Sequence, residues 1–235
     1  MPPMSANPTI VFASVAAWAL TVATATAQTL PLESVAGLKL HNVQAEPVTL
    51  QGKRGLRVTV SAEAKLRARE TPLELLAVVE GSDFTNGVIE AEIAGEPAPD
   101  APDGARGFVG IAFRVRPDLL TYDSFYLRPT NGRADDQVRR NHSVQYVSQP
   151  DWPWPRLRKE APERYESYVD LEPGKWTRIR IEVQGERARL YVHGQAQPTL
   201  VVNDLKTGAT GSGAIALWSD PGTVAHFRDL RMVRQ

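Results

Sequence analysis

The stretch that decides the fold reads Trp176-Thr-Arg-Ile-Arg-Ile-Glu-Val183, then Gln184-Gly-Glu-Arg187, then Ala188-Arg-Leu-Tyr-Val192. In its first part apolar and polar residues alternate, which is typical of a strand with one face on a core and one face in water. The apolar positions are Trp176, Ile179, Ile181 and Val183, and the polar positions are Arg178, Arg180 and Glu182. The four residues in the middle form a turn, so the stretch predicts a β-hairpin.

Similar short runs recur along the chain between turn signals, and no stretch of ten residues keeps an uninterrupted helical period. The clearest runs are residues 55–61, 87–93, 108–114 and 214–218. Residues 73–79 fit either a buried strand or one helical turn, and residues 96–104, with three prolines, predict an exposed loop. The pattern predicts an all-β fold with two antiparallel sheets, as a sandwich or a barrel.

The composition narrows the class of protein further. The chain has 235 residues, 42% of them hydrophobic, no cysteine, and 27 Lys+Arg against 27 Asp+Glu. This excludes disordered, collagen-like and disulfide-stabilised classes. A net charge of zero provides no overall field to hold a nucleic acid, so we expect no nucleic-acid partner.

The N-terminal segment has the pattern of a secretory signal peptide. The first charged residue is Glu33, residues 10–23 are largely apolar, and Ala25-Thr-Ala27 fits a cleavage site. The segment departs from the usual pattern because residues 1–8 contain no Lys or Arg. The apolar run is shorter than the roughly 20 residues of a spanning helix. We therefore expect a signal peptide over residues 1–27, one domain over residues 28–235, export to the periplasm or exterior, and no membrane span after cleavage.

Several of these runs also carry a family resemblance. Residues 84–93, 107–114, 174–183 with 188–192, 213–218 and 225–230 resemble the concanavalin A-like lectin/glucanase superfamily, and most of all its bacterial laminin-G-like and 3-keto-disaccharide hydrolase-like domains. The resemblance spans roughly residues 75–233 and implies a jelly-roll sandwich whose concave sheet binds carbohydrate. Since the matching residues mainly build strands and turns, the resemblance leaves the activity open.

Residues 114–168 are dense in polar groups that strands do not require, and they form the candidate site. Residues 128–159 contain seven Lys and Arg and only three Asp. This local excess of positive charge would suit an anionic sugar. Equally, the arginines could pair with Glu160, Glu163, Glu166 and Asp170 to pin a long loop. The candidate ligand-binding residues are Arg114, Tyr126, Arg128, Gln145, Tyr146, Trp152, Trp154 and Arg158.

The segment Asp151-Trp-Pro-Trp-Pro155 is the most suggestive local feature of the site. A proline disfavours the helical conformation in the residue before it, so we expect Trp152 and Trp154 on extended backbone. A rigid indole pair can stack on sugar rings, or it can cap the core beneath the loop. Trp176 and Trp218 occupy apolar strand positions and are expected in the core.

The residues for catalysis are less clearly marked. The resemblance to glucanases implies two glutamates flanking an aspartate, a motif that Glu90-Ala-Glu92 lacks, so these two glutamates are expected on a solvated strand face. The remaining acid–base candidates are His142, Asp135, Asp136, Glu160 and Glu166, and the hydrolase hypothesis uses His142 and Glu166 as the pair.

We expect no cofactor, because the chain has no metal-binding Cys/His pattern. The superfamily implies that a structural Ca²⁺ could use Asp204 or Asp229. The first hypothesis is an exported glycan-binding domain, and the alternative is a glycoside or 3-keto-glycoside hydrolase on the same scaffold. A protein-interaction role for the basic segment is the third.

Overall fold

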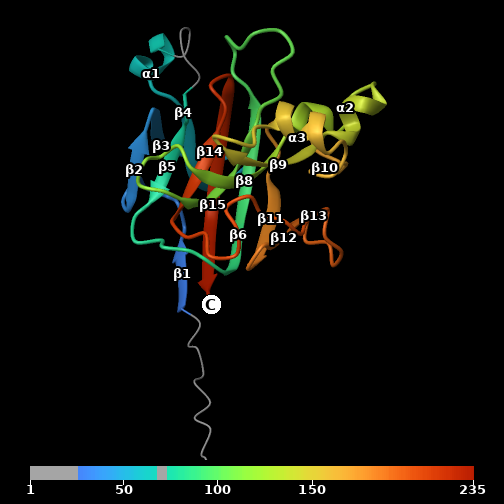
Figure 1. The fold of residues 1–235 in the computed structure, drawn as a ribbon. Coiled ribbons are helices and arrows are strands. Elements are labelled where there is room, and N and C mark those ends of the chain that lie inside the picture. Colours follow the sequence, from blue (N-terminus) through green and yellow to red (C-terminus); the bar gives the residue numbers. More distant parts are fainter. Residues whose placement is uncertain (1–25, 68–72) are drawn as a thin grey trace, which may run out of the picture.

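The computed structural model describes residues 26–67 and 73–235, which form two antiparallel sheets packed face to face (Figure 1). Sheet A holds, in spatial order, β13 (Leu200–Val202), β12 (Arg187–Val192), β11 (Thr177–Gln184), β6 (Gly87–Pro97), β15 (Thr223–Arg234), β4 (Lys53–Val60) and β3 (Val43–Leu50), and β1 (Thr26–Leu30) pairs with β15. Sheet B holds β10 (Glu166–Ser167), β9 (Val144–Gln149), β8 (Tyr122–Leu127), β7 (Val109–Val115), β14 (Ala214–Ser219), β5 (Leu76–Val79) and β2 (Leu38–His41). The predicted two-sheet jelly-roll sandwich is confirmed.

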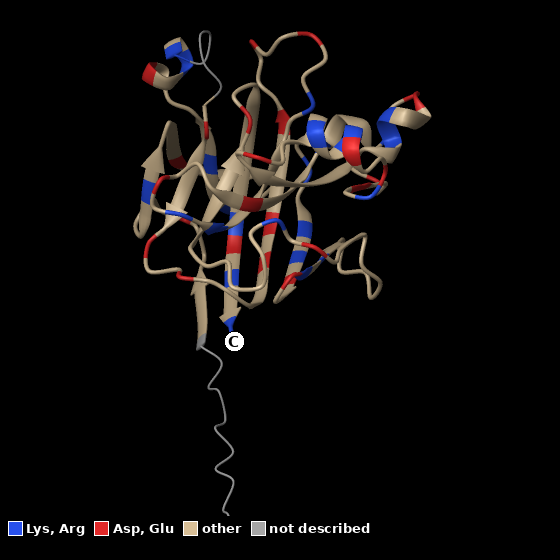
Figure 2. Ribbon diagram, in the orientation of Figure 1, with Lys and Arg blue, Asp and Glu red and all other residues tan. Residues whose placement is uncertain are grey.

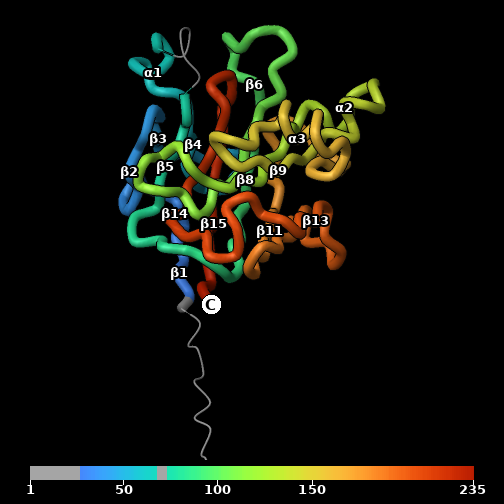
Figure 3. The backbone as a smooth tube through the Cα atoms, in the orientation of Figure 1, coloured from blue at the N-terminus to red at the C-terminus, as the bar shows by residue number. Residues whose placement is uncertain are grey.

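The chain passes repeatedly from one sheet to the other. The strands β4, β5, β6 and β7 follow one another in sequence but belong alternately to sheets A and B. The first described strand, β1, runs antiparallel to the last part of β15, so the two ends of the described fold lie together (Figure 3). Most neighbouring strands are therefore distant in sequence, and the register between them decides which side chains meet.

The β-hairpin that the sequence predicts over residues 176–192 is present. Residues Gln184 and Arg187 pair across the turn, and the side chains of Ile179, Ile181 and Val183 are buried between the sheets. Trp176 does not join them, because it shares the outward parity of Arg178 and lies half-buried with its Nε1 donating to the Leu50 carbonyl at 3.1 Å. The expectation that Trp176 packs in the core is wrong.

The outward face of sheet A is charged. Charged residues of both signs lie along β6, β11 and β15 (Figure 2), and the burial pattern places them on the side away from the core. Glu90 pairs with Arg231 at 3.0 Å, and Glu92 pairs with Lys53 at 3.3 Å and Arg228 at 3.2 Å. The predicted solvated position of these two glutamates is confirmed. Residues 76–79 form a fully buried strand, which resolves the ambiguity of that run. The loop predicted over residues 96–104 is present but spans residues 98–108, because Glu96 and Pro97 belong to β6.

Three short helices were not predicted: α1 (Ala62–Arg67), α2 (Gln137–Asn141) and α3 (Trp154–Glu160). The last of them corrects the expectation of an extended indole pair, because Trp154 is the first residue of α3. Pro155 is accommodated since the first turn of a helix needs no N–H donor at that position. Only Trp152 stays on extended backbone, in an isolated bridge to Ser148.

Candidate functional site

Two adjoining cavities open on the outer face of sheet B, the face turned away from sheet A. The first, the aromatic cavity, has a volume of about 300 Å³, and its lining includes Glu74, Phe108, Tyr126, Trp154, Trp218 and Asp220. The second, the basic cavity, has a volume of about 290 Å³, and its lining includes Arg106, Phe108, Arg128, Asn131, Arg139, His142, Trp154 and Arg158. Because Phe108 and Trp154 line both, the two cavities form one site with an aromatic end and a basic end.

The strand register builds the aromatic floor. Tyr126 of β8 pairs with Gly110 of β7, which in turn pairs with Trp218 of β14, so all three positions share one face of the sheet. A side chain at Gly110 would collide with Tyr126, since its Cβ would lie 2.6 Å from the Tyr126 Cβ. With no side chain between them, the rings of Tyr126 and Trp218 stack with their centroids 4.9 Å apart. Phe108 lies 5.4 Å from the Tyr126 ring and extends this apolar surface.

Two carboxyl groups border the aromatic floor. Trp218 Nε1 donates to the Tyr122 hydroxyl at 3.0 Å, and that hydroxyl donates to Glu74. Burial raises the pKa of Glu74, although hydrogen bonds from Tyr122 and Trp218 oppose the shift. Burial also raises the pKa of Asp220. Both groups are therefore harder to ionise than ordinary surface carboxyls.

Arg128 lies beneath the basic cavity with 4% of its surface exposed. Its Nη1 donates to Glu166 Oε1 at 2.9 Å and to the His142 carbonyl at 3.1 Å. Its Nη2 donates to the Tyr126 hydroxyl at 3.1 Å and to Gln145 Oε1 at 3.0 Å. Arg128 therefore ties the aromatic floor on β8 to β9 and β10.

Helix α3 supplies the exposed part of the site. Trp154 and Arg158 are four residues apart and share one helix face, and the Arg158 guanidinium lies 4.7 Å from the Trp154 ring centroid. Arg158 Nε also donates to Glu166 Oε2 at 2.9 Å. The Trp154 side chain remains 41% exposed, so it is accessible to a ligand.

Glu166 and His142 lie close together, with His142 Nε2 3.5 Å from Glu166 Oε2. Burial alone would raise the pKa of Glu166, but hydrogen bonds from Arg158 and Arg128 outweigh it and hold the pKa below its usual range. Burial lowers the pKa of His142, and nearby Glu166 opposes that shift. At neutral pH this site therefore holds an ionised Glu166 whose two oxygens are both engaged by arginines.

The loop-pinning interpretation applies to part of the arginine-rich segment. Arg133 pairs with Asp170 at 2.7 Å, and Arg156 pairs with Glu160 at 2.9 Å. Glu166 pairs with Arg128 and Arg158, as described above. Three of the four expected carboxylates thus hold the segment in place.

The structure brings together most of the sequence-predicted site residues. Those that meet are Tyr126, Arg128, His142, Gln145, Trp154, Arg158 and Glu166. Trp152 lies outside both cavities, where Arg156 stacks on it at 3.7 Å and Lys206 at 4.6 Å. The proposed side-by-side indole platform is therefore reduced to Trp154.

Arg114 and Tyr146 belong to a separate buried network. Arg114 is fully buried and donates to the carbonyls of Thr85, Gly185 and Gly208 at distances of 2.8 to 3.1 Å. The Tyr146 hydroxyl donates to Asp123 at 2.7 Å, and Asp123 lies 3.8 Å from Arg114. These two residues connect loops inside the sandwich, so they do not reach the site.

Sequence reasoning missed four residues of the site: Glu74, Arg106, Phe108 and Asp220. Phe108 is expected in a strand, and its parity with Gly110 could have placed it on the outer face. The other three lie in loops, and no local pattern marks them. Trp218 was expected in the core; it is buried, but against Tyr126 on the outer face.

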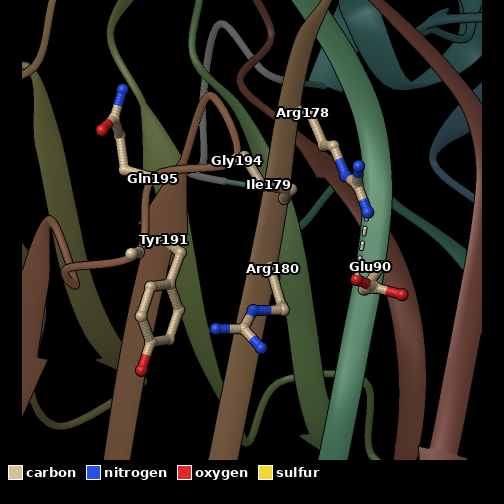
Figure 4. A pocket seen from close by; sticks show the side chains of 8 residues that line it. Glu90, Arg178, Ile179, Arg180, Tyr191, Gly194 and Gln195 are labelled. Atoms are coloured by element: carbon tan, nitrogen blue, oxygen red, sulfur yellow. Dashed lines mark hydrogen bonds and ion pairs between the residues drawn. The ribbon is translucent and has the colours of Figure 1, made fainter.

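A third cavity, of about 270 Å³, lies on the outer face of sheet A near β11 and β12 (Figure 4). Its charged groups are neutralised locally, because Arg178 pairs with Glu90 at 3.4 Å and Arg180 pairs with Glu182 at 2.9 Å. Tyr191 is covered by the Arg180 guanidinium at 4.1 Å. This cavity offers a ligand fewer free groups than the site on sheet B.

The suggested Ca²⁺ ligands do not fit a cation site. Asp204 accepts from Tyr165 and Lys206, and Asp229 accepts from Arg228. Within residues 26–67 and 73–235, no three His, Asp or Glu side chains cluster as metal ligands would. Over the same residues, no helix has the length and apolar character needed to cross a membrane.

Comparisons with known proteins identify the fold. No family model matches the chain, and no curated protein matches its sequence. Among solved structures it is similar to carbohydrate-binding module CBM66 from Bacillus subtilis, with a TM-score of 0.53, 13% identity and coverage of 83% of this chain and 95% of that one.

Two further structures agree with this likeness. A protein of unknown function with a galectin-like fold, also from Bacillus subtilis, has a TM-score of 0.53, 11% identity and coverage of 88% and 94%. Peanut lectin has a TM-score of 0.50, 9% identity and coverage of 90% and 97%. The chain therefore has the fold of the concanavalin A-like superfamily.

Proposed function

We propose that this chain is a carbohydrate-recognising domain that binds a glycan across the site on the outer face of sheet B. The observation that carries the proposal is the exposed ring of Trp154 beside the half-buried Phe108, above a floor formed by the buried rings of Tyr126 and Trp218. Flat apolar rings can stack on sugar rings, and polar groups at the rim can orient hydroxyl groups. The similarity to a carbohydrate-binding module supports the same conclusion at the level of the fold.

The site also has the preorganisation that binding needs. Trp154 is the first residue of a helix and lies against Arg158, while Tyr126 and Trp218 are buried in regular strands. Side chains that are already ordered lose little conformational entropy when a ligand binds. The stacking surface is therefore ready for a ligand without a rearrangement of the sheet.

The first test replaces the exposed indole. Trp154→Ala should weaken glycan binding about fivefold or more, because stacking of one aromatic ring contributes on the order of 1 kcal/mol or more. The measurement is retention on a glycan array followed by titration calorimetry with the retained glycans. Trp176→Ala is the matched control, since Trp176 is a half-buried tryptophan on the other sheet. Unchanged affinity in the Trp154 variant would contradict the proposal.

The hydrolase alternative depends on different residues from those first considered. Because Glu166 is ionised and held by two arginines, it is suited to positioning rather than to donating a proton. A general acid is instead favoured at Glu74 or Asp220, which border the aromatic floor and have raised pKa values because they are buried.

The same glycan samples distinguish the two activities. A binding domain should release the glycans intact after prolonged incubation. Release of reducing sugar by the wild type, abolished in Glu74→Gln or Asp220→Asn with affinity retained, would establish the hydrolase instead.

We further propose that the protein is exported and that residues 28–235 form its single mature domain. Most of the expected signal peptide, residues 1–25, lies outside the described residues. The remaining two residues, Thr26 and Ala27, begin β1. An extracellular or periplasmic location would suit a protein that binds polysaccharide.

A further inference from the structure

The basic cavity contains more positive charge than its described surroundings neutralise. Its four arginines are Arg106, Arg128, Arg139 and Arg158. Of the acidic residues that the structure describes, only Glu166 pairs with any of them, and Arg128 and Arg158 share it. The cluster therefore retains an excess of three positive charges, and this excess is concentrated beside the sugar-stacking surface.

Three of these arginines have hydrogen-bond donors to spare. Arg106 donates only to the Gly104 carbonyl among the described residues. Arg158 uses Nε and Nη2 on Glu166, which leaves Nη1 available. Arg139 Nε is buried and has no partner in the described part of the chain. Buried donors without an acceptor are costly, so a ligand that supplies one is favoured.

These arginines lie close enough to repel one another. The pKa of Arg106 is lowered, mainly by burial and further by Arg139 and Arg128. Bringing cations together without a counter-ion costs free energy, and an anion bound among them would recover that cost. Guanidinium groups present paired donors that match the oxygens of a carboxylate or a sulfate.

A buried hydrogen-bond acceptor also lines the basic cavity, next to the arginine donors. Asn131 is only 4% exposed, and its Nδ2 is fixed by donating to the His142 carbonyl at 3.1 Å. Its Oδ1 is buried and accepts from no residue that the structure describes. A sugar hydroxyl next to an anionic substituent would satisfy this acceptor.

We propose that the glycan is acidic, with its anionic substituent bound in the basic cavity by Arg106, Arg139 and Arg158. The sugar ring that carries this group then stacks on Trp154 and Phe108, which line both cavities. The substituent is a uronate carboxylate or a sulfate ester, since both offer several oxygens to the guanidinium groups. The inference rests on the proposed glycan binding and adds the class of ligand.

The test uses an array of glycans in matched pairs. Each uronic-acid glycan is compared with its carboxyl-reduced form, and each sulfated glycan with its desulfated form. The wild type should bind an acidic member at least about tenfold more tightly than its neutral partner, and the preference should weaken as salt is raised. Which pairs show the preference identifies the substituent as carboxylate or sulfate.

Two variants connect the preference to this cavity. Arg106→Gln and Arg139→Gln should each weaken binding of the acidic glycan about tenfold, because each removes a charge-assisted hydrogen bond. Binding of the neutral partner should change much less, so that the ratio of acidic to neutral affinity falls. Arg189→Gln, at an exposed arginine of β12, is the matched control, and thermal melts of all variants check the fold.

The outcomes separate this inference from the function on which it rests. Equal binding of acidic and neutral partners overturns the acidic ligand. A preference that survives both arginine substitutions overturns its binding in the basic cavity, and in either case glycan binding stands. If the folded wild type retains no glycan on the array, the proposed function itself fails, and the acidic-ligand inference fails with it.

Discussion

Three arginines in or next to the predicted site segment have different roles, and burial and partners separate them. Arg114 is fully buried among loop carbonyls, Arg128 is buried beneath the site, and Arg106 keeps free donors at its rim. The sequence shows only that arginines are frequent there. What each one does depends on acceptors that lie far away in sequence, such as Gly185 and Gly208 for Arg114. Individual residue roles were therefore the least predictable part of the site.

The role of Arg114 can be tested by removing its charge. Arg114→Met should lower the free energy of unfolding by about 3 to 5 kcal/mol, because it leaves Asp123 as a buried carboxyl without its cationic neighbour. Urea denaturation measures the loss, and the exposed Arg116→Met is the control. Glycan affinity of the folded variant should equal that of the wild type. A loss of affinity with stability unchanged would return Arg114 to the binding site.

At the scale of elements, the alternation of apolar and polar residues predicts the structure wherever the pattern within a single strand is sufficient. The hairpin β11–β12 and the outward charged face of β6 follow from local periodicity, so both were predicted from the sequence. The aromatic floor depends on the register of β7 and β8 with β14, which comes from a distant part of the chain. Helix α3 also escaped prediction, because its seven residues include a proline and are too few to show a helical period.

Strand β1 bears on the expected export. Cleavage after Ala27 would remove two paired residues but would keep the pairing of Gln28, Thr29 and Leu30 with β15. The mature chain should therefore retain an edge strand, and we expect cleavage before β1 is paired. Mass spectrometry of the protein from the cell envelope should find Gln28 at the N-terminus. Recovery of intact Met1 in the cytosolic fraction would contradict export.

For the whole molecule, the two sheets differ in what they expose. The outer face of sheet A exposes ion pairs to solvent, whereas the outer face of sheet B holds the aromatic and basic cavities. Balanced charge over the chain thus hides a local positive excess at one site. The net charge of zero therefore describes the electrostatic field of the whole protein. It gives no information about a local site for an acidic ligand.

The stability of the whole fold should fall in weak acid because of His226 on sheet A. Burial, with a smaller effect of Arg57, lowers the pKa of His226 to about 4, whereas an exposed histidine titrates near 6.5. Protonation therefore favours the unfolded state. The stabilising effect of a neutral His226 is complete above about pH 6.5 and is lost as the pH falls towards 4, by about 3 kcal/mol in all.

Urea denaturation between pH 4 and pH 7 measures this dependence, and His226→Gln should make it shallower. His193→Gln, which changes an exposed histidine, is the control and should keep the slope of the wild type. Glu74 and Asp220 act in the opposite direction, because their raised pKa values add stability at low pH that is lost as the pH rises through them. Glu74 and Asp220 titrate in the wild type and in both histidine variants. The difference between the stability curves of the wild type and His226→Gln therefore isolates the effect of His226. Parallel curves for the wild type and His226→Gln would show that protonation of this histidine does not destabilise the fold.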